Sequence, residues 1–344
     1  MNSNEMLKGH RYARILNEQR NYYLIDLEGE ELKAVMSGNL RHLAESSMDR
    51  PAVGDSVVVS YNPHEGTAKI HAVEERKSVL LRKTAGSFAG EQVIASNLDT
   101  VFIVNSLNRE LNLRRMERYL VMVRDGGIRP VLVLSKSDLI SSEERQELLQ
   151  EVQIVAGEVP VHVTSMKRPW SMEVLKKYLL PGHTLALIGS SGVGKSTLTN
   201  FFLGQQLQDT GGIRDDDDRG KHTTTSRTLF PLENGSFLLD TPGIREIQLW
   251  SGSEGLDDTF SDILTAMSQC RFSDCCHDAE PGCSLREALE SGEIEEDRYN
   301  SYLKLRREQA FMEMRKNARS QRREKEIWKQ RSKESRRGRK IYRR

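Results

Sequence analysis

The chain has 344 residues, a length that suits two or three domains rather than one compact core. Its formal net charge is only +1, but residues 303–344 hold 18 Lys and Arg against five Glu, a net charge of +13. The preceding residues therefore carry about −12, so a basic arm follows an acidic body. No run of about 18 apolar residues occurs, and residues 1–10 lack the apolar stretch of a secretory signal. These features argue against a membrane protein and predict a cytoplasmic one.

The first 80 residues predict a small all-β unit. Five short alternating segments are separated by turn-forming clusters. The segments are Arg11–Ile15, Tyr22–Asp26, Leu32–Val35, Ser56–Ser60 and Ala68–Val73. Five short strands fit an OB-like β-barrel, a fold that often binds oligonucleotides. A β-domain that packs without touching nucleic acid fits the pattern equally well.

Residues 95–246 alternate between short apolar runs and helical patterns, which is typical of a doubly wound α/β domain. The expected parallel strands are Val101–Asn105, Pro130–Leu134, Val159–Thr164, Thr184–Ile188 and Phe237–Leu239. The expected helices between them include Leu113–Arg124 and Ser142–Ala156. Residues 247–298 predict a shorter, cysteine-bearing and mostly helical domain, and residues 299–344 a charged helical or disordered tail.

A complete phosphate-binding loop follows the expected strand Thr184–Ile188 and precedes a helical stretch, Thr197–Leu203. The loop consists of Gly189, Ser190, Ser191, Gly192, Val193, Gly194, Lys195 and Ser196. Its glycines let backbone amides turn towards the phosphates, and the helix N-terminus adds partial positive charge. We expect Lys195 to reach the β- and γ-phosphates, Ser196 to ligate Mg²⁺, and Thr197 to complete the phosphate contacts.

Two further motifs decide between ATP and GTP. Downstream, an apolar strand leads into Asp240-Thr241-Pro242-Gly243, where the carboxylate can hold Mg²⁺ through water and the Gly243 amide can sense the γ-phosphate. Upstream, a strand leads into Ser135-Lys136-Ser137-Asp138, which resembles the N-K-x-D base-reading motif of GTPases. A carboxylate at Asp138 accepts both the ring N–H and the exocyclic amine of guanine, and it opposes the ring-nitrogen acceptor of adenine.

Ser135 stands where Asn is usual in the base-reading motif, and its shorter hydroxyl predicts lower guanine affinity with selectivity retained through Asp138. The segment Thr164-Ser165-Met166 follows the next strand and could cap the base, with Ser165 as the contacting residue. Both motifs precede the phosphate-binding loop, whereas in ordinary GTPases they follow it. The motif order is therefore circularly permuted, a rearrangement that a parallel sheet tolerates when the new termini open at the surface.

The segment Gly220-Lys221-His222-Thr223-Thr224-Thr225 lies where a first switch belongs, and we expect Thr224 to close onto Mg²⁺. Ile244 occupies the position where many GTPases carry a glutamine that orients water. Because an isoleucine cannot do this, hydrolysis should be slow alone or use His222 once a partner orders the loop. His222 is equally consistent with a loop residue that has no catalytic role.

The permuted order, the G-K-H-T-T-T segment, the sequence D-T-P-G-I-R at residues 240–245 and a cysteine cluster resemble the ribosome small-subunit-dependent GTPase A family. The resemblance covers nearly the whole chain. It implies an N-terminal OB-fold, a circularly permuted GTPase domain and a C-terminal zinc domain. It also implies late maturation of the small ribosomal subunit, with GTP hydrolysis to GDP and phosphate stimulated by that subunit.

All four cysteines lie between residues 270 and 283. Their clustering favours metal ligands over a disulfide framework, and Cys270-x4-Cys275-x-His277-x5-Cys283 offers three thiolates and one imidazole to a structural Zn²⁺. Cys276 is a fifth candidate between two others. The family resemblance supports Cys270, Cys275, His277 and Cys283 as the ligands. Unligated cysteines in a small helical domain are the alternative.

The basic tail can neutralise RNA phosphates, which favours contact with rRNA over a merely solvated helix. Taken together, the sequence predicts a monomeric GTPase that binds GTP or GDP with Mg²⁺, carries one Zn²⁺ and docks on the small ribosomal subunit. The alternative is a nucleotide-gated RNA-binding scaffold with incidental hydrolysis. A P-loop kinase or ATPase leaves residues 135–138 unexplained.

Overall fold

The computed structural model describes residues 10–44, 46–83, 91–108, 111–204, 227–240, 254–278 and 280–314. The chain forms two compact units, Met1–Gln248 and Leu249–Arg344. In these described ranges no helix has the length and apolar character needed to cross a membrane.

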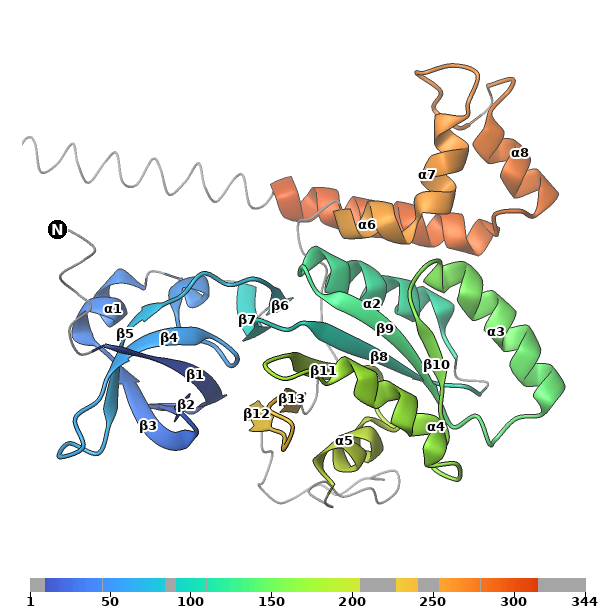
Figure 1. Cartoon of the computed structure of the whole chain (residues 1–344). Coiled ribbons are helices and arrows are strands. Elements are labelled where there is room, and N and C mark those ends of the chain that lie inside the picture. The colour runs from blue at the N-terminus through green and yellow to red at the C-terminus, as the bar shows by residue number, and fades with distance from the viewer. Residues whose placement is uncertain are drawn as a thin grey trace, which may run out of the picture. The chain divides into compact units, whose positions relative to one another are not determined.

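The first unit begins with a closed five-stranded β-barrel (Figure 1). Its strands are β1 (Arg11–Glu18), β2 (Tyr23–Leu27), β3 (Glu30–Met36), β4 (Ser56–Ser60) and β5 (Ala68–Val73), with helix α1 (Gly38–Leu43) and the 3₁₀ turn η1 (Ser47–Asp49) between β3 and β4. The order is β1-β2-β3-β5-β4, and the barrel closes because β1 also pairs antiparallel with β4. Alternate strand residues fill its interior, among them Ile15, Ile25 and Ile70. The predicted N-terminal β-barrel is confirmed.

The remainder of the first unit is an α/β domain. Its sheet contains β8 (Thr100–Ser106), β9 (Arg129–Ser135), β10 (Val161–Val163), β11 (Thr184–Ile188), β12 (Thr228–Pro231) and β13 (Phe237–Asp240). The order is β10-β9-β8-β11-β13-β12, and every pairing is parallel except that of β12 with β13. All five strands predicted for this domain form; β12 is the additional one.

Helices cover both faces of this sheet (Figure 1). They are α2 (Leu113–Asp125), α3 (Ser142–Ala156), α4 (Trp170–Glu173), the 3₁₀ helix η2 (Val174–Tyr178) and α5 (Lys195–Leu203). On one face, Phe102 and Val131 pack with Leu175 of η2 and Leu198 of α5 in a single buried cluster. On the other face, α2 contacts β8 and β9, with Leu120 fully buried. Strand β8 is buried along its whole length because both of its faces are covered.

Two features were not predicted. Strands β6 (Val79–Lys83) and β7 (Glu91–Ser96) form a separate two-stranded sheet between the barrel and the α/β domain. Strand β12 pairs with β1 as well as with β13, so barrel and α/β domain share one eleven-stranded sheet. The sequence pattern does not predict these strands, because a short strand is stabilised mainly by the strand with which it pairs.

The second unit contains α6 (Glu254–Thr259), α7 (Ser261–Ser268) and α8 (Ser284–Ser291), followed by a helix over residues 296–314. Its helices bury apolar side chains that include Leu256, Ile263 and Leu285. Phe260 is fully buried and its ring lies 5.5 Å from that of Tyr302. An ion pair between Arg298 and Asp262, at 2.7 Å, joins the last helix to α7.

Candidate nucleotide and metal sites

The phosphate-binding loop connects β11 to α5, in the predicted strand–loop–helix context. Gly189 has φ of 144°, and a Cβ atom there would lie 2.2 Å from the Val104 carbonyl oxygen. Gly194 caps α5 with φ of 95°, a left-handed conformation that favours glycine. Both glycines are therefore required by the backbone itself, before any ligand is considered.

The side chain of Lys195 folds back onto the phosphate-binding loop. Its Nζ donates to the carbonyl oxygens of Gly189 at 2.8 Å and Ser190 at 2.6 Å. An ammonium group held against the loop backbone is directed to the place where phosphates would rest on the amides. Ser196 and Thr197 follow in the first turn of α5, and both are partly exposed, so their hydroxyls remain accessible.

Helix α2 holds the loop from the side. A guanidinium nitrogen of Arg115 donates to the Ser190 hydroxyl. The Tyr119 hydroxyl also hydrogen-bonds Ser190, and burial raises the pKa of Tyr119. Ser190 is thus fixed by α2 through its side chain and by Lys195 through its carbonyl. Sequence reasoning did not single out Arg115 or Tyr119, because their position beside the loop depends on how α2 packs on β8.

The base-reading loop follows β9, and its Asp138 lies against the capping loop. The Ser165 hydroxyl donates to Asp138 Oδ1 at 2.6 Å, and Lys167 Nζ lies 3.4 Å from Oδ2. The hydrogen bond from Ser165 is the main cause that holds the pKa of Asp138 below its usual range. The carboxylate is therefore ionised and oriented, as guanine recognition requires.

Backbone contacts and a second arginine tie the two base-side loops together. The Ser137 amide donates to the Thr164 carbonyl at 3.2 Å, and Arg168 donates to the Ser137 hydroxyl at 3.0 Å. Lys136, the residue before Ser137, has φ of 58°, a backbone conformation that is uncommon for residues other than glycine. The sequence analysis did not identify Lys167 and Arg168, because the capping segment that it proposed ended at Met166.

Ser135 connects the base side with the phosphate side. Its buried hydroxyl donates to the Val193 carbonyl in the phosphate-binding loop at 2.6 Å and lies 3.2 Å from the Asn105 carbonyl. The hydroxyl is directed at the loop backbone, and the short side chain suits the space because a Cβ added to Gly194 would lie 3.7 Å from the Ser135 Cβ. Ser135 therefore bridges the two halves of the site across a sequence separation of 58 residues.

Several predicted residues lie outside the described part of the chain: His222, Thr224, Gly243 and Ile244. For Asp240 only the backbone is described; it ends β13 and pairs with Thr228. The base-reading and phosphate-binding motifs lie at the carboxyl ends of the parallel strands β9 and β11, with β8 between them, at the edge where ligands bind in open α/β sheets.

The second unit brings the four predicted metal ligands together. The ligand atoms of Cys270, Cys275, His277 and Cys283 all lie within 4.8 Å of one another. His277 Nδ1 is 3.5 Å from Cys270 Sγ and 3.6 Å from Cys283 Sγ. Ligand–ligand separations of this size fit a tetrahedral site with zinc–ligand bonds of about 2.0–2.3 Å. Cys276 is exposed and its Sγ is directed at the Asp274 carbonyl, so it stands apart from this group.

Comparisons with known proteins agree with this arrangement. The sequence model of the RsgA GTPase family matches residues 73–250. The protein "small ribosomal subunit biogenesis GTPase RsgA" of Methanosarcina acetivorans is 44% identical over 299 residues, covering 87% of this chain and 79% of the relative. "Small ribosomal subunit biogenesis GTPase RsgA 1" of Oceanobacillus iheyensis is 42% identical, covering 92% and 90%.

Solved structures show the same architecture. The crystal structure of YjeQ from Thermotoga maritima is similar with a TM-score of 0.64 and 28% identity, over 88% of this chain and 99% of that one. The structure of YloQ, described as a circularly permuted GTPase, is similar in fold with a TM-score of 0.61 and 22% identity, over 89% and 96%. The multidomain architecture predicted from the sequence is confirmed. The chain therefore belongs to the RsgA GTPase family and is a GTP hydrolase.

Proposed function

We propose that the chain hydrolyses GTP while it assists the maturation of the small ribosomal subunit, and that the subunit stimulates hydrolysis. The names of the two relatives described above support a role in maturation of the small ribosomal subunit. The geometry supports the choice of nucleotide. The single observation that carries this choice is the Asp138 carboxylate, oriented by Ser165 and joined to the phosphate-binding loop through Ser135.

Within this site, Lys195 binds the β- and γ-phosphates while the amides of residues 189–194 surround them. Ser196 and Thr224 would ligate Mg²⁺, Asp240 would hold the ion through water, and the metal would neutralise charge on the phosphates. Gly243 contacts the γ-phosphate through its amide. His222 assists the attacking water, a role that Ile244 cannot fill.

The second unit binds one structural Zn²⁺ through Cys270, Cys275, His277 and Cys283. The ion would hold together the segment between α7 and α8. The basic residues after Leu303 contact rRNA phosphates, and the protein acts as a cytoplasmic monomer. Binding through these phosphate contacts should weaken as the salt concentration rises.

The test compares GTP and ATP hydrolysis by the purified protein with and without small ribosomal subunits. We expect slow GTP turnover that rises sharply with subunits and little ATP turnover. Equal tight binding of both nucleotides would contradict the guanine assignment. GTP turnover that subunits leave unchanged would favour an RNA-binding scaffold with incidental hydrolysis.

The variant Asp138→Asn tests whether Asp138 recognises the guanine base. Guanine presents an exocyclic amine to the carboxylate, whereas xanthine presents a carbonyl at the same position, which the side-chain amide of the variant can satisfy. The variant should lose GTP turnover and gain turnover of xanthosine triphosphate. Loss of both activities would mean that Asp138 acts elsewhere than at the base.

A further inference from the structure

Strand β1 of the barrel contacts three strands of the GTPase domain. Its first half, up to Arg14, pairs with β4 and closes the barrel, whereas Asn17 pairs with Thr228 of β12. The pairing with β2 is shifted between Ile15 and Asn17, which marks a β-bulge. Bulges redirect the side chains that follow them. The bulge therefore lies where the second partner of β1 changes from β4 to β12, while the pairing with β2 continues to Glu18.

Asn17 is almost completely buried, with 4% of its surface exposed, and its amide crosses the domain boundary. Its Nδ2 donates to the Arg227 carbonyl at 2.9 Å and to the Thr228 hydroxyl at 2.8 Å, while its Oδ1 accepts from Gln19 at 2.5 Å. A buried amide with all of these hydrogen bonds satisfied fixes its partners firmly, since breaking them would leave polar groups unpaired.

The backbone that Asn17 contacts lies next to Asp240, a predicted residue of the phosphate and Mg²⁺ site. Thr228 pairs with Asp240, the residue that opens the D-T-P-G motif, and Arg227 follows the predicted switch threonines, 223–225, by two residues. Asn17 thus fixes the backbone at the level where β13 delivers Asp240.

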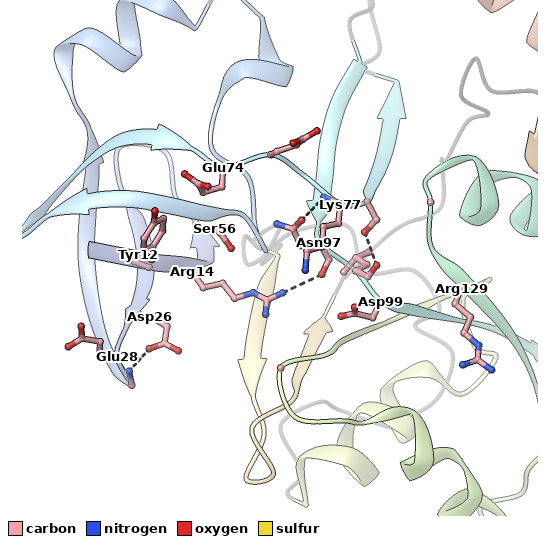
Figure 2. A pocket seen from close by; sticks show the side chains of 17 residues that line it. Tyr12, Arg14, Asp26, Glu28, Ser56, Glu74, Lys77, Asn97, Asp99 and Arg129 are labelled. Carbon is pink, nitrogen blue, oxygen red and sulfur yellow. Dashed lines mark hydrogen bonds between the residues drawn. The ribbon is translucent and has the colours of Figure 1, made fainter. Parts of the chain in front are cut away.

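Arg14 contacts the residues at which β11 and β13 begin. It donates to the Thr184 hydroxyl and, at 3.3 Å, to the Asn97 carbonyl, and its guanidinium lies 4.4 Å from the centre of the Phe237 ring. Thr184 and Phe237 are the first residues of β11 and β13 and lie side by side. Figure 2 shows Arg14 reaching from the barrel towards Asn97 and Asp99, in a cleft of about 840 Å³. Phe237 precedes Asp240 by three residues, about 10 Å along an extended strand.

We propose that Asn17, a barrel residue, is a positioning residue for GTP hydrolysis: it holds the start of β12 in register with Asp240, whereas Arg14 only docks the barrel. The inference rests on the GTP hydrolysis proposed above. Because Asn17 contacts neither the base-reading loop nor the phosphate-binding loop in the described structure, its loss should affect turnover and leave nucleotide affinity unchanged.

The experiment uses the full-length protein with Asn17→Ala and Asn17→Asp. The aspartate keeps the size of the side chain and the acceptor for Gln19 but removes the donor to Arg227, so it tests the hydrogen bond if the alanine variant folds poorly. We expect kcat to fall about 5- to 10-fold in both variants, because a shifted β12 would displace Asp240 from the position that the transition state requires. The KM for GTP and the affinity for a fluorescent GDP analogue should change less than about twofold.

Arg14→Met is the matched control at the same junction. It removes the guanidinium but keeps the apolar stem, so it should lower the melting temperature and leave kcat unchanged. An unchanged kcat in both Asn17 variants, or an equal fall of kcat in Arg14→Met, would overturn the inference.

A second readout does not depend on catalysis. Hydrogen exchange of the β12 amides should be faster in both Asn17 variants than in the parent and Arg14→Met proteins. If the parent protein hydrolyses no GTP, the proposed function fails, while the exchange comparison still decides whether Asn17 holds β12. Equal exchange in all four proteins would show that it does not.

Discussion

The nucleotide site and the cysteine cluster are built in opposite ways. The nucleotide site lies on a sheet covered on both faces, where residues such as Phe102 and Leu120 are completely buried and the loops are joined by direct hydrogen bonds. The cluster lies between α7 and α8, three of its four residues are only partly buried, and its four candidate ligand atoms converge within 4.8 Å. The packed core therefore organises the nucleotide site, whereas we expect the arrangement of the cysteine cluster to depend on a bound metal.

Removal of zinc should give the largest effect. Structural zinc contributes about 10 kcal/mol or more in small zinc-binding peptides, far more than any single contact in the first unit. Cys275→Ser or a strong chelator should therefore remove the metal and reduce the helical circular dichroism that residues 254–314 contribute. Binding of GDP should persist, measured by fluorescence of a labelled analogue. Cys276→Ser is the control, and loss of zinc in that variant would mean that the ligand set is different.

Asp138→Asn tests the nucleotide site and should give the second largest effect. Two hydrogen bonds to a charged carboxylate contribute about 3 kcal/mol together, so GTP affinity should fall about 100-fold. The zinc content should remain at one per chain. Measured by isothermal titration and metal analysis, a change in both quantities would show that the two sites depend on each other.

Ser135→Ala measures how much the hydrogen bond between Ser135 and Val193 contributes to nucleotide affinity. Its loss leaves the buried Val193 carbonyl without this donor, which costs about 1 kcal/mol. GTP and GDP affinities should both fall about fivefold, because the bridge supports the loop in either state. The alanine variant contradicts this account if only GTP binding weakens, since the effect would then concern the γ-phosphate alone.

Arg115→Ala should have the smallest effect. Arg115 is exposed and contributes one hydrogen bond to Ser190, while Tyr119 and Lys195 still hold that residue. We expect a two- to fivefold lower kcat/KM for GTP and little change in melting temperature. Arg145→Ala on α3 is a control outside the phosphate-binding loop. A loss above about 100-fold in Arg115→Ala would instead place the guanidinium in contact with the phosphates.

The local motifs were predictable because each carries its own geometric requirement. The strand Thr184–Ile188 and the helix Ser142–Ala156 appear with the predicted bounds, since an apolar run of five and a Ser-capped amphipathic stretch are local signals. The spacing of the cysteines and His277 and the family resemblance together predicted the four residues whose candidate ligand atoms converge. Strand β12 and the hairpin β6–β7 were not, because short strands depend on partners that are distant in the sequence.

The sequence by itself determined the chemistry of this protein: the glycines and Lys195 of the phosphate-binding loop, the carboxylate of Asp138, the permuted order of the motifs, and a Cys3His ligand set. Each is written in a few neighbouring residues. Only the tertiary structure decided how these pieces are joined, through Ser135 to Val193, Arg115 to Ser190, and Asn17 to the start of β12. Those contacts span 58, 75 and 210 residues, and they exist because the sheet brings together strands that the sequence keeps apart.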